Sequence, residues 1–223
     1  MTEIRIDKLI RSRRRTISLE VTREAKLVVR APTHAALNYI QGILCKKQDW
    51  IKKKQALLQE RNNRYPPKKF IDGESFHYLG RSYRLDLVEE NAIRLTDHLE
   101  FPKRMISDAR YHLIKWYKTA AYEKIKERVD HYSKITGLSY SSIKISGAKK
   151  RLGSCSAKGN LNFIWRLVMA PLEVVDYVVV HELVHLDEKN HSRSFWNKLC
   201  IIIPDYKKRV FWLKENMNLF DVL

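Results

Sequence analysis

The sequence predicts an α+β fold. The order of predicted elements, with strands and then a helix in each half and further helices at the end, is typical of this class rather than of regular β-α repeats. A histidine pair at helical spacing and a strongly basic N-terminal third are the two other leading observations. With 223 residues, of which 44% are hydrophobic, the chain is long enough to bury a core without disulfides.

The N-terminal third is expected to combine strands with one helix. Alternation of apolar and polar side chains predicts strands over residues 4–6, 17–21 and 27–29. The arginine-rich run 11–15 is expected at a hairpin between the first two strands. Residues 34–60 place apolar side chains about 3.6 residues apart, which predicts a single amphipathic helix. Residues 62–67 are rich in Asn and Pro and predict a linker.

The remaining residues predict a second, larger domain. Strands are expected over residues 76–79, 83–88, 91–101, 143–146 and 160–168. A long helix is expected over residues 107–134, with Gly137 at its end. We therefore predict a basic subdomain of β-hairpin and helix over residues 1–69 and a second, larger domain over residues 70–223.

Charge is concentrated near the N-terminus. The chain has a formal net charge of +18, and residues 1–69 contribute +12 of it, with 18 Lys and Arg against six Asp and Glu. Such a segment attracts nucleic acid, nucleotides or an anionic membrane surface, or it is simply a solvated basic face. No apolar run approaches the ~20 residues of a membrane span. Without a secretory signal, and with an odd number of cysteines, three, the chain is expected to be cytoplasmic.

The segment His181-Glu182-Leu183-Val184-His185 is the strongest chemical signal in the chain. It ends a run with helical spacing that begins after Pro171. On a helix, two histidines four residues apart lie about 6 Å apart along the axis and can share one Zn²⁺. Glu182 then lies beside the metal and can take a proton from a water molecule that the metal activates. The alternative is an ordinary amphipathic helix whose histidines are satisfied polar groups.

A catalytic zinc needs a third protein ligand, and His191 is the candidate. Asn190 can supply a left-handed turn that brings the chain back, and Ser192 is expected to cap a following helix over residues 193–202. Asp187 and Glu188 are the competing ligands, because each is a carboxylate close after His185.

Residues 149–156 form a second, weaker signal. The sequence Lys-Lys-Arg-Leu-Gly-Ser-Cys-Ser can hold an anionic substrate group or an oxyanion, or it is merely a turn between two strands. Cys155 is a conceivable metal ligand, but three histidines already suffice, so we expect it to be a small buried thiol.

Motifs along almost the whole chain support a family resemblance. They are Val28–Pro32, Trp50–Ile51, Asp72–Glu74, Tyr78–Tyr83, Arg151–Ser156, Gly159–Asn162, Trp165–Leu167, Ala170–Pro171, Val174–Leu186, Asn190–Ser192 and Phe195–Trp196. This pattern closely resembles the YgjP-like metallopeptidases, a zincin-like group related to the SprT and WLM proteins. One departure is Leu152, where the family usually has Trp.

The resemblance implies a zincin-like catalytic domain with one Zn²⁺ per chain. His181, His185 and His191 would be the metal ligands and Glu182 the general base of a metallopeptidase that acts on a peptide or protein. In zincin-like folds the strand before the active-site helix, here residues 160–168, forms the upper rim of the cleft and binds an extended substrate. Arg151, Asn162 and Arg166 are the candidate substrate contacts.

Two other functions stay open at this point. The same metal chemistry can attack phosphorus, and the basic cluster near Arg151 suits a nucleotide, so a metal-dependent phosphohydrolase is the first alternative. The second is a nucleic-acid-associated protein in which the basic N-terminal third carries the function and the metal helix is an auxiliary site.

Overall fold

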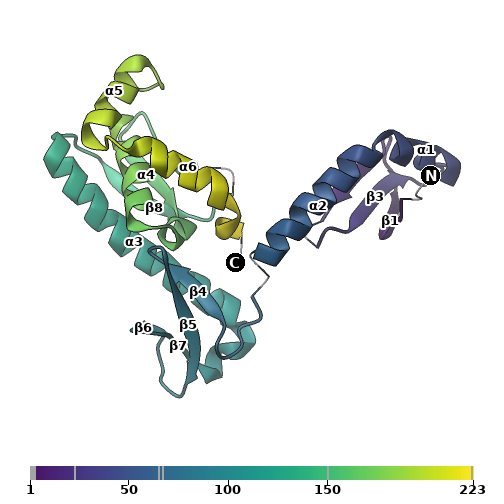
Figure 1. Ribbon diagram of the computed structural model, residues 1–223, viewed down its shortest axis with the longest axis horizontal. Coiled ribbons are helices and arrows are strands. Elements are labelled where there is room, and N and C mark those ends of the chain that lie inside the picture. Colours follow the sequence, from purple (N-terminus) through teal and green to yellow (C-terminus); the bar gives the residue numbers. More distant parts are fainter. Residues whose placement is uncertain (1–3, 23, 65, 67, 150, 222) are drawn as a thin grey trace. The chain divides into compact units, whose positions relative to one another are not determined.

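The computed structural model divides the chain into two compact units, Met1–Pro67 and Lys68–Leu223 (Figure 1). It describes residues 4–22, 24–64, 66, 68–149, 151–221 and 223. Part of the predicted linker, and Lys150 of the predicted basic cluster, lie outside these residues. Within the described part of the chain, no helix combines the length and the hydropathy that are needed to cross a membrane.

The first unit packs a three-stranded sheet against two helices. Its elements are β1 (Lys8–Ser12), β2 (Ser18–Val21), β3 (Leu27–Pro32), α1 (Leu37–Lys46) and α2 (Gln48–Arg64). Strand β3 is central, with β1 parallel to it on one side and β2 antiparallel on the other. Apolar side chains of β3 meet Ile40, Leu44 and Ile51 of the helices in a buried core.

Three expectations for this unit are wrong. Residues 4–6 form no strand; their isoleucines pack against the core, which produces the same alternation as a strand. No hairpin joins β1 and β2, because both strands pair with β3 instead of with each other. Arg11 lies in β1, where its guanidinium group donates to the carbonyl oxygens of residues 32, 33 and 35 at 2.7–3.2 Å. The single predicted helix is interrupted at Lys47.

The second unit contains two small sheets and a group of helices. Its strands are β4 (Ser75–Tyr78), β5 (Arg81–Val88), β6 (Arg94–Leu95), β7 (Leu99–Pro102), β8 (Ser142–Ser146), β9 (Gly153–Cys155) and β10 (Asn160–Ile164). Its helices are η1 (Lys103–Asp108), α3 (Ala109–Thr136), η2 (Trp165–Met169), α4 (Leu172–Val184), α5 (Arg193–Ile202), α6 (Tyr206–Asn216) and η3 (Met217–Asp221). The strands are ordered β4-β5-β7-β6 and β8-β10-β9. The predicted α+β class is thus confirmed.

Strand β10 is shorter than predicted and lies inside its sheet. Residues 165–169 form a 3₁₀ helix instead of extending the strand. Strand β10 pairs with β8 on one side and with β9 on the other, so it has no free edge for an extended substrate. Strand β9 pairs with β10 alone among the described strands, so it is an edge strand, and it also contacts α4. The expectation that residues 160–168 bind a substrate by strand addition is therefore wrong.

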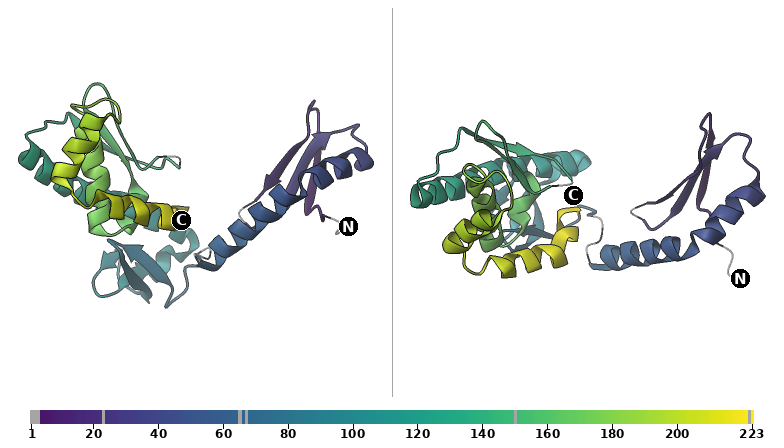
Figure 2. Two further views of the ribbon diagram at one scale, coloured as in Figure 1. Left: turned by 45° about the horizontal axis from the view of Figure 1, so that its top comes forward. Right: turned by 90° about the horizontal axis from the view of Figure 1, so that it is seen from above.

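Helix α4 is the central element of this unit. It runs beside α3 and α6 (Figures 1 and 2), and its residues 174–180 are all buried. The carboxylate of Asp176 accepts hydrogen bonds from Arg128 Nε at 2.6 Å and Nη2 at 3.0 Å, and from the Tyr132 hydroxyl at 3.1 Å. A paired and hydrogen-bonded buried charge of this kind fixes the position of α4 relative to α3.

Candidate metal centre

Three histidines converge where α4 ends. His181 lies in the last turn of α4 and His185 caps it, so their imidazole rings lie one turn apart with centroids 4.9 Å from each other. His191 follows the turn after α4, and its Nε2 lies 3.0 Å from Nε2 of His181. One ring nitrogen from each histidine lies within 4.8 Å of the other two. The predicted three residues are therefore brought together.

The turn that carries His191 is built by side-chain hydrogen bonds. Asn190 Oδ1 accepts from the backbone N–H of Ser192 at 3.1 Å. Ser192 Oγ accepts from the N–H of Phe195 at 3.4 Å, which confirms Ser192 as the cap of α5. Asn190 does not adopt the predicted left-handed conformation. Its side chain, rather than its backbone, shapes the turn.

Neighbouring groups orient the rings. Nδ1 of His185 lies 2.9 Å from the carbonyl oxygen of Glu188. A carbonyl can only accept, so Nδ1 carries the proton and Nε2 presents a lone pair. The carboxylate of Glu188 points elsewhere, since it accepts from Ser194 Oγ at 2.7 Å and from Lys198 Nζ at 2.9 Å. Asp187 also pairs with Lys198. Neither predicted competitor belongs to the histidine cluster.

Phe195 contacts the three imidazoles, and the sequence alone did not indicate this role. Its ring is fully buried and lies 4.6–4.9 Å, centroid to centroid, from all three imidazoles. Trp196 stacks on His191 with centroids 5.7 Å apart. The sequence feature that could have indicated this contact is the position of Phe195 and Trp196 in the first turn of α5, which begins directly after the capping residue Ser192.

Desolvation favours the neutral form of two of the three histidines, His181 and His191. Desolvation, followed by the positive charges of the other two histidines, lowers the pKa of His181 to about 4. Desolvation, followed by the charge of His185, also lowers the pKa of His191. Neutral imidazoles keep the lone pairs that a metal ion requires.

Glu182 lies beside the histidines in a nearly closed environment. The residue is 5% exposed, and its Oε2 has no hydrogen-bond partner among the described residues. Burial raises the pKa of Glu182 to about 7, although the charge of Arg151 opposes this shift. A buried carboxylate oxygen without a hydrogen-bond partner destabilises the folded protein unless a further group binds to it. Three converging imidazoles and this carboxylate are a donor set that fits a transition metal and a water molecule.

The chain matches a known protein family over most of its length. The family model of the YgjP-like metallopeptidase domain matches residues 15–216. The chain belongs to the YgjP-like family. The UTP pyrophosphatase of Escherichia coli (strain K12) is 33% identical over 67 residues, which cover 28% of this chain and 40% of that protein. The chain thus spans less than half the length of this curated relative.

A solved structure is also similar in part. The crystal structure of the metallopeptidase zymogen of Pyrococcus abyssi abylysin matches 41% of this chain and 93% of that chain, with 22% identity and a TM-score of 0.38.

The three predicted substrate contacts of this YgjP-like chain lie in different places. Arg151 lines the pocket of the histidine cluster, which has a volume of about 510 Å³. Asn162 lies on β10 and lines an adjoining pocket, and its buried Oδ1 has no hydrogen-bond partner among the described residues. Arg166 does not line either pocket. Its Nη2 donates to the carbonyl of Leu223 at 2.9 Å, and its guanidinium group lies over the Trp165 ring.

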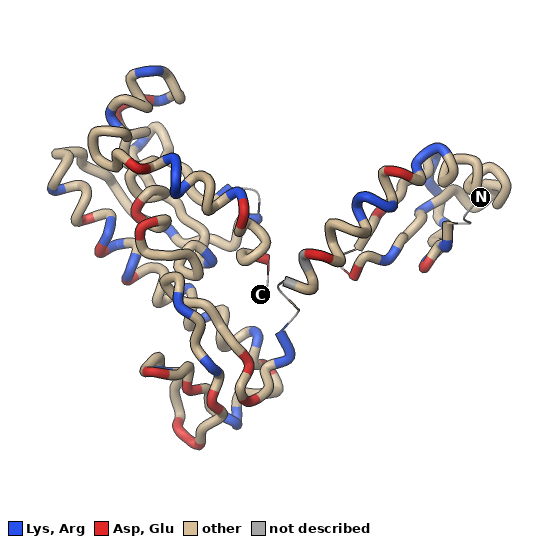
Figure 3. Tube along the Cα trace, viewed as in Figure 1, with Lys and Arg blue, Asp and Glu red and all other residues tan. Residues whose placement is uncertain are grey.

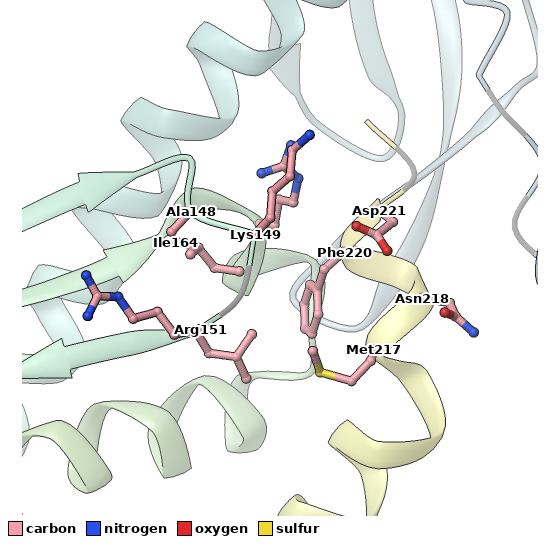
Figure 4. Close-up of a pocket in the computed structure, with 10 residues that line it drawn as sticks. Ala148, Lys149, Arg151, Ile164, Met217, Asn218, Phe220 and Asp221 are labelled. Atoms are coloured by element: carbon pink, nitrogen blue, oxygen red, sulfur yellow. The ribbon is translucent and has the colours of Figure 1, made fainter. Parts of the chain in front are cut away.

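Arg166 instead lines a small separate cavity of about 90 Å³, together with Leu152 and Phe220. Figure 4 shows that Arg151, which also borders this cavity, extends away from Phe220. Leu152, which replaces the family's usual Trp, therefore contributes to this cavity and not to the pocket of the histidines.

Cys155 lies in the pocket of the histidines and is partly exposed. Burial raises the pKa of its thiol, an effect that the charge of Lys189 partly opposes. It is not part of the histidine cluster.

Gly153 allows β9 to approach Glu182 closely. A Cβ atom at this position would lie 2.6 Å from Glu182 Oε1 and 2.7 Å from its Cγ. Both atoms belong to a buried side chain that cannot move aside freely. We expect Gly153→Ala to lower hydrolysis by about 10²-fold, because a displacement of about 1 Å at a reacting group has this effect.

The measurement is steady-state hydrolysis combined with metal content, which should stay unchanged. Gly42→Ala is the control, because a Cβ there meets nothing within 4 Å. Full activity of Gly153→Ala would contradict the close approach.

Proposed function

We propose that this chain is a metal-dependent hydrolase in which His181, His185 and His191 hold one Zn²⁺ and Glu182 acts as general base. The observation that carries the proposal is the convergence of three imidazoles beside a buried carboxylate whose Oε2 has no hydrogen-bond partner among the described residues. Imidazole ligands suit zinc. A divalent cation at this site supplies Lewis-acid activation of the attacking water and neutralises charge at the reacting group.

Three residues of the protein supply the other parts of the proposed mechanism. Glu182 takes a proton from the attacking water and returns it to the leaving group, which is general acid–base catalysis. The carbonyl of Glu188 keeps His185 in the tautomer that presents Nε2. Phe195 packs behind the imidazoles and excludes solvent from one side of the cluster.

A nucleoside triphosphate is the substrate class that the pocket fits best. The pocket of the histidines and the adjoining pocket share Arg151, and Lys189 and Lys144 line one each. Three Ser and two Asn side chains also line these two pockets, and among the described residues Glu182 is their only acidic one. Arg and Lys bind phosphate oxygens through charge-assisted hydrogen bonds. The relative named UTP pyrophosphatase supports the same substrate class.

A peptide is the second candidate substrate. The family model is described as a metallopeptidase domain, and the open edge of β9 beside Glu182 could pair with an extended chain. This assigns to β9 the role that the sequence suggested for residues 160–168.

Substrate profiling separates the two candidates. Zinc-loaded protein is incubated with UTP, with ATP and with a peptide library, and the products are resolved by chromatography. We expect the triphosphates to lose phosphate or pyrophosphate, and Arg151→Ala to raise KM about 10-fold or more through a lost charge-assisted contact. Lys158→Ala is the control, since this exposed lysine lines neither pocket.

Peptide cleavage without triphosphate hydrolysis would favour the second candidate. Zinc-loaded protein that hydrolyses neither substrate would contradict the hydrolase proposal.

We propose a cytoplasmic location on the basis of the cysteines. Cys45, Cys155 and Cys200 are all free, and Cys45 and Cys200 are exposed. Exposed free thiols persist in reducing surroundings, which supports our proposal that the protein works in the cytoplasm.

A further inference from the structure

Apolar and basic side chains alternate along one side of α1 and α2. They recur every three or four residues, the spacing that places side chains on one face of a helix. We call this set the α1–α2 stripe; its members are Tyr39, Ile43, Lys46, Trp50, Lys53, Lys54 and Leu57. The backbone N–H of Lys47 donates to the carbonyl of Ile43, and that of Ile51 donates to Lys47. The helical spacing therefore continues through the bend between the two helices (Figure 2).

The stripe is turned away from the core of the first unit. Ile40, Leu44 and Ile51 face the sheet and are buried. On the stripe, by contrast, Tyr39 is 65% exposed and Trp50 is 46% exposed. These exposed aromatic side chains do not pack in the core of this unit. Their regular helical spacing indicates a contact surface.

The lysines of the stripe are available to a partner. Lys46, Lys53 and Lys54 are exposed, and none of them forms an ion pair with a described residue. Figure 3 shows Lys and Arg recurring along these helices, in a segment that contributes +12 to the net charge. The partner should therefore be a polyanion.

The alternation of aromatic side chains and lysines indicates which kind of polyanion binds. Tyr39 and Trp50 are eleven residues apart, about 16 Å along the helices, and Lys46 lies between them. A single-stranded nucleic acid offers phosphates to the lysines and free base faces to the aromatic rings. A duplex keeps its bases stacked inside. A membrane surface suits a continuous apolar face, which lysines interrupt here within each turn or two.

We propose that the α1–α2 stripe binds single-stranded nucleic acid, with phosphates on Lys46, Lys53 and Lys54 and bases stacked on Tyr39 and Trp50. This binding is independent of the hydrolase site, since no residue of the stripe lines the pocket of the histidines. It adds a second activity to the chain.

Fluorescence anisotropy of the full chain with labelled 20-nucleotide oligo(dT) and oligo(U) tests the proposal. Three phosphate contacts to a single strand give a log–log salt slope of about −2, so affinity should fall roughly 20-fold between 50 and 200 mM salt. Trp50→Ala should weaken binding about fivefold or more through the lost stack, whereas Trp50→Phe should retain most of it.

Charge reversal supplies a matched comparison. The triple change of Lys46, Lys53 and Lys54 to Glu should abolish binding at 100 mM salt. The same triple change at Lys8, Lys26 and Lys52 is the control, because these lysines are exposed and lie off the stripe but alter net charge equally. Both triple variants should retain the unfolding temperature of the wild type, since all six side chains lie outside the core.

Four results would overturn the proposal. Equal loss in both triple variants would assign binding to net charge alone. Duplex binding as tight as single-strand binding, with Trp50→Ala unaffected, would remove the stacking role. Binding to phosphatidylserine vesicles but not to oligonucleotides would make the partner a membrane. A lower unfolding temperature of Trp50→Ala with unchanged oligonucleotide binding would assign the stripe to packing within the protein.

Discussion

If Glu182 is the general base that we propose beside a zinc ion, Glu182→Gln is expected to lower hydrolysis by about 10²–10⁴-fold without loss of zinc, because this is the usual contribution of a general base. Gln has nearly the same shape as Glu but cannot accept a proton at neutral pH. The side chain is buried beside Gly153, so the amide should occupy the position of the carboxylate. The three imidazoles are unchanged, and metal affinity should therefore remain.

The experiment compares turnover and zinc content of wild type, Glu182→Gln and Glu173→Gln. Glu173 is the matched control, because it lies in the first turn of the same helix and is exposed. Both variants should contain one zinc per chain, and the control should turn over like the wild type. An active Glu182→Gln enzyme would show that another group accepts the proton.

Local patterns predicted the part of the site that lies on consecutive turns of one helix. The spacing of His181 and His185 fixes their relation, because an α-helix returns to the same face after four residues. Ser192 and Gly137 were equally predictable, since capping depends on one or two neighbouring residues; Gly137 adopts a φ of 72° at the end of α3.

Contacts between distant segments could not be predicted in this way. The pairing of both β1 and β2 with β3 depends on which strands meet in the folded core, and local alternation contains no such information. The approach of Gly153 to Glu182 joins residues 29 positions apart, and a glycine before Ser and Cys equally indicates a simple turn. Arg166 does not line the pocket of the histidines, because residues 165–169 form a 3₁₀ helix instead of continuing the strand.

His191→Ala is expected to weaken zinc binding by about 10²-fold or more, whereas Glu188→Ala should have a much smaller effect. Removing His191 takes away one of three nitrogen donors, and a loss even in the surrounding shell of a metal site costs 10–100-fold. The Glu188 carboxylate bonds to Ser194 and Lys198 instead. Its contact with His185 uses the backbone carbonyl, which Glu188→Ala retains.

Competition with a fluorescent zinc chelator measures both affinities on one scale. Asp187→Ala is the matched control, because it removes the other carboxylate that pairs with Lys198 and leaves the imidazoles intact. Since Glu188 and Asp187 share this partner, their two variants should resemble each other and remain close to the wild type. The opposite order, with Glu188→Ala losing zinc and His191→Ala retaining it, would place the carboxylate in the metal site. His191 would then be left as a substrate contact beside His181 and His185.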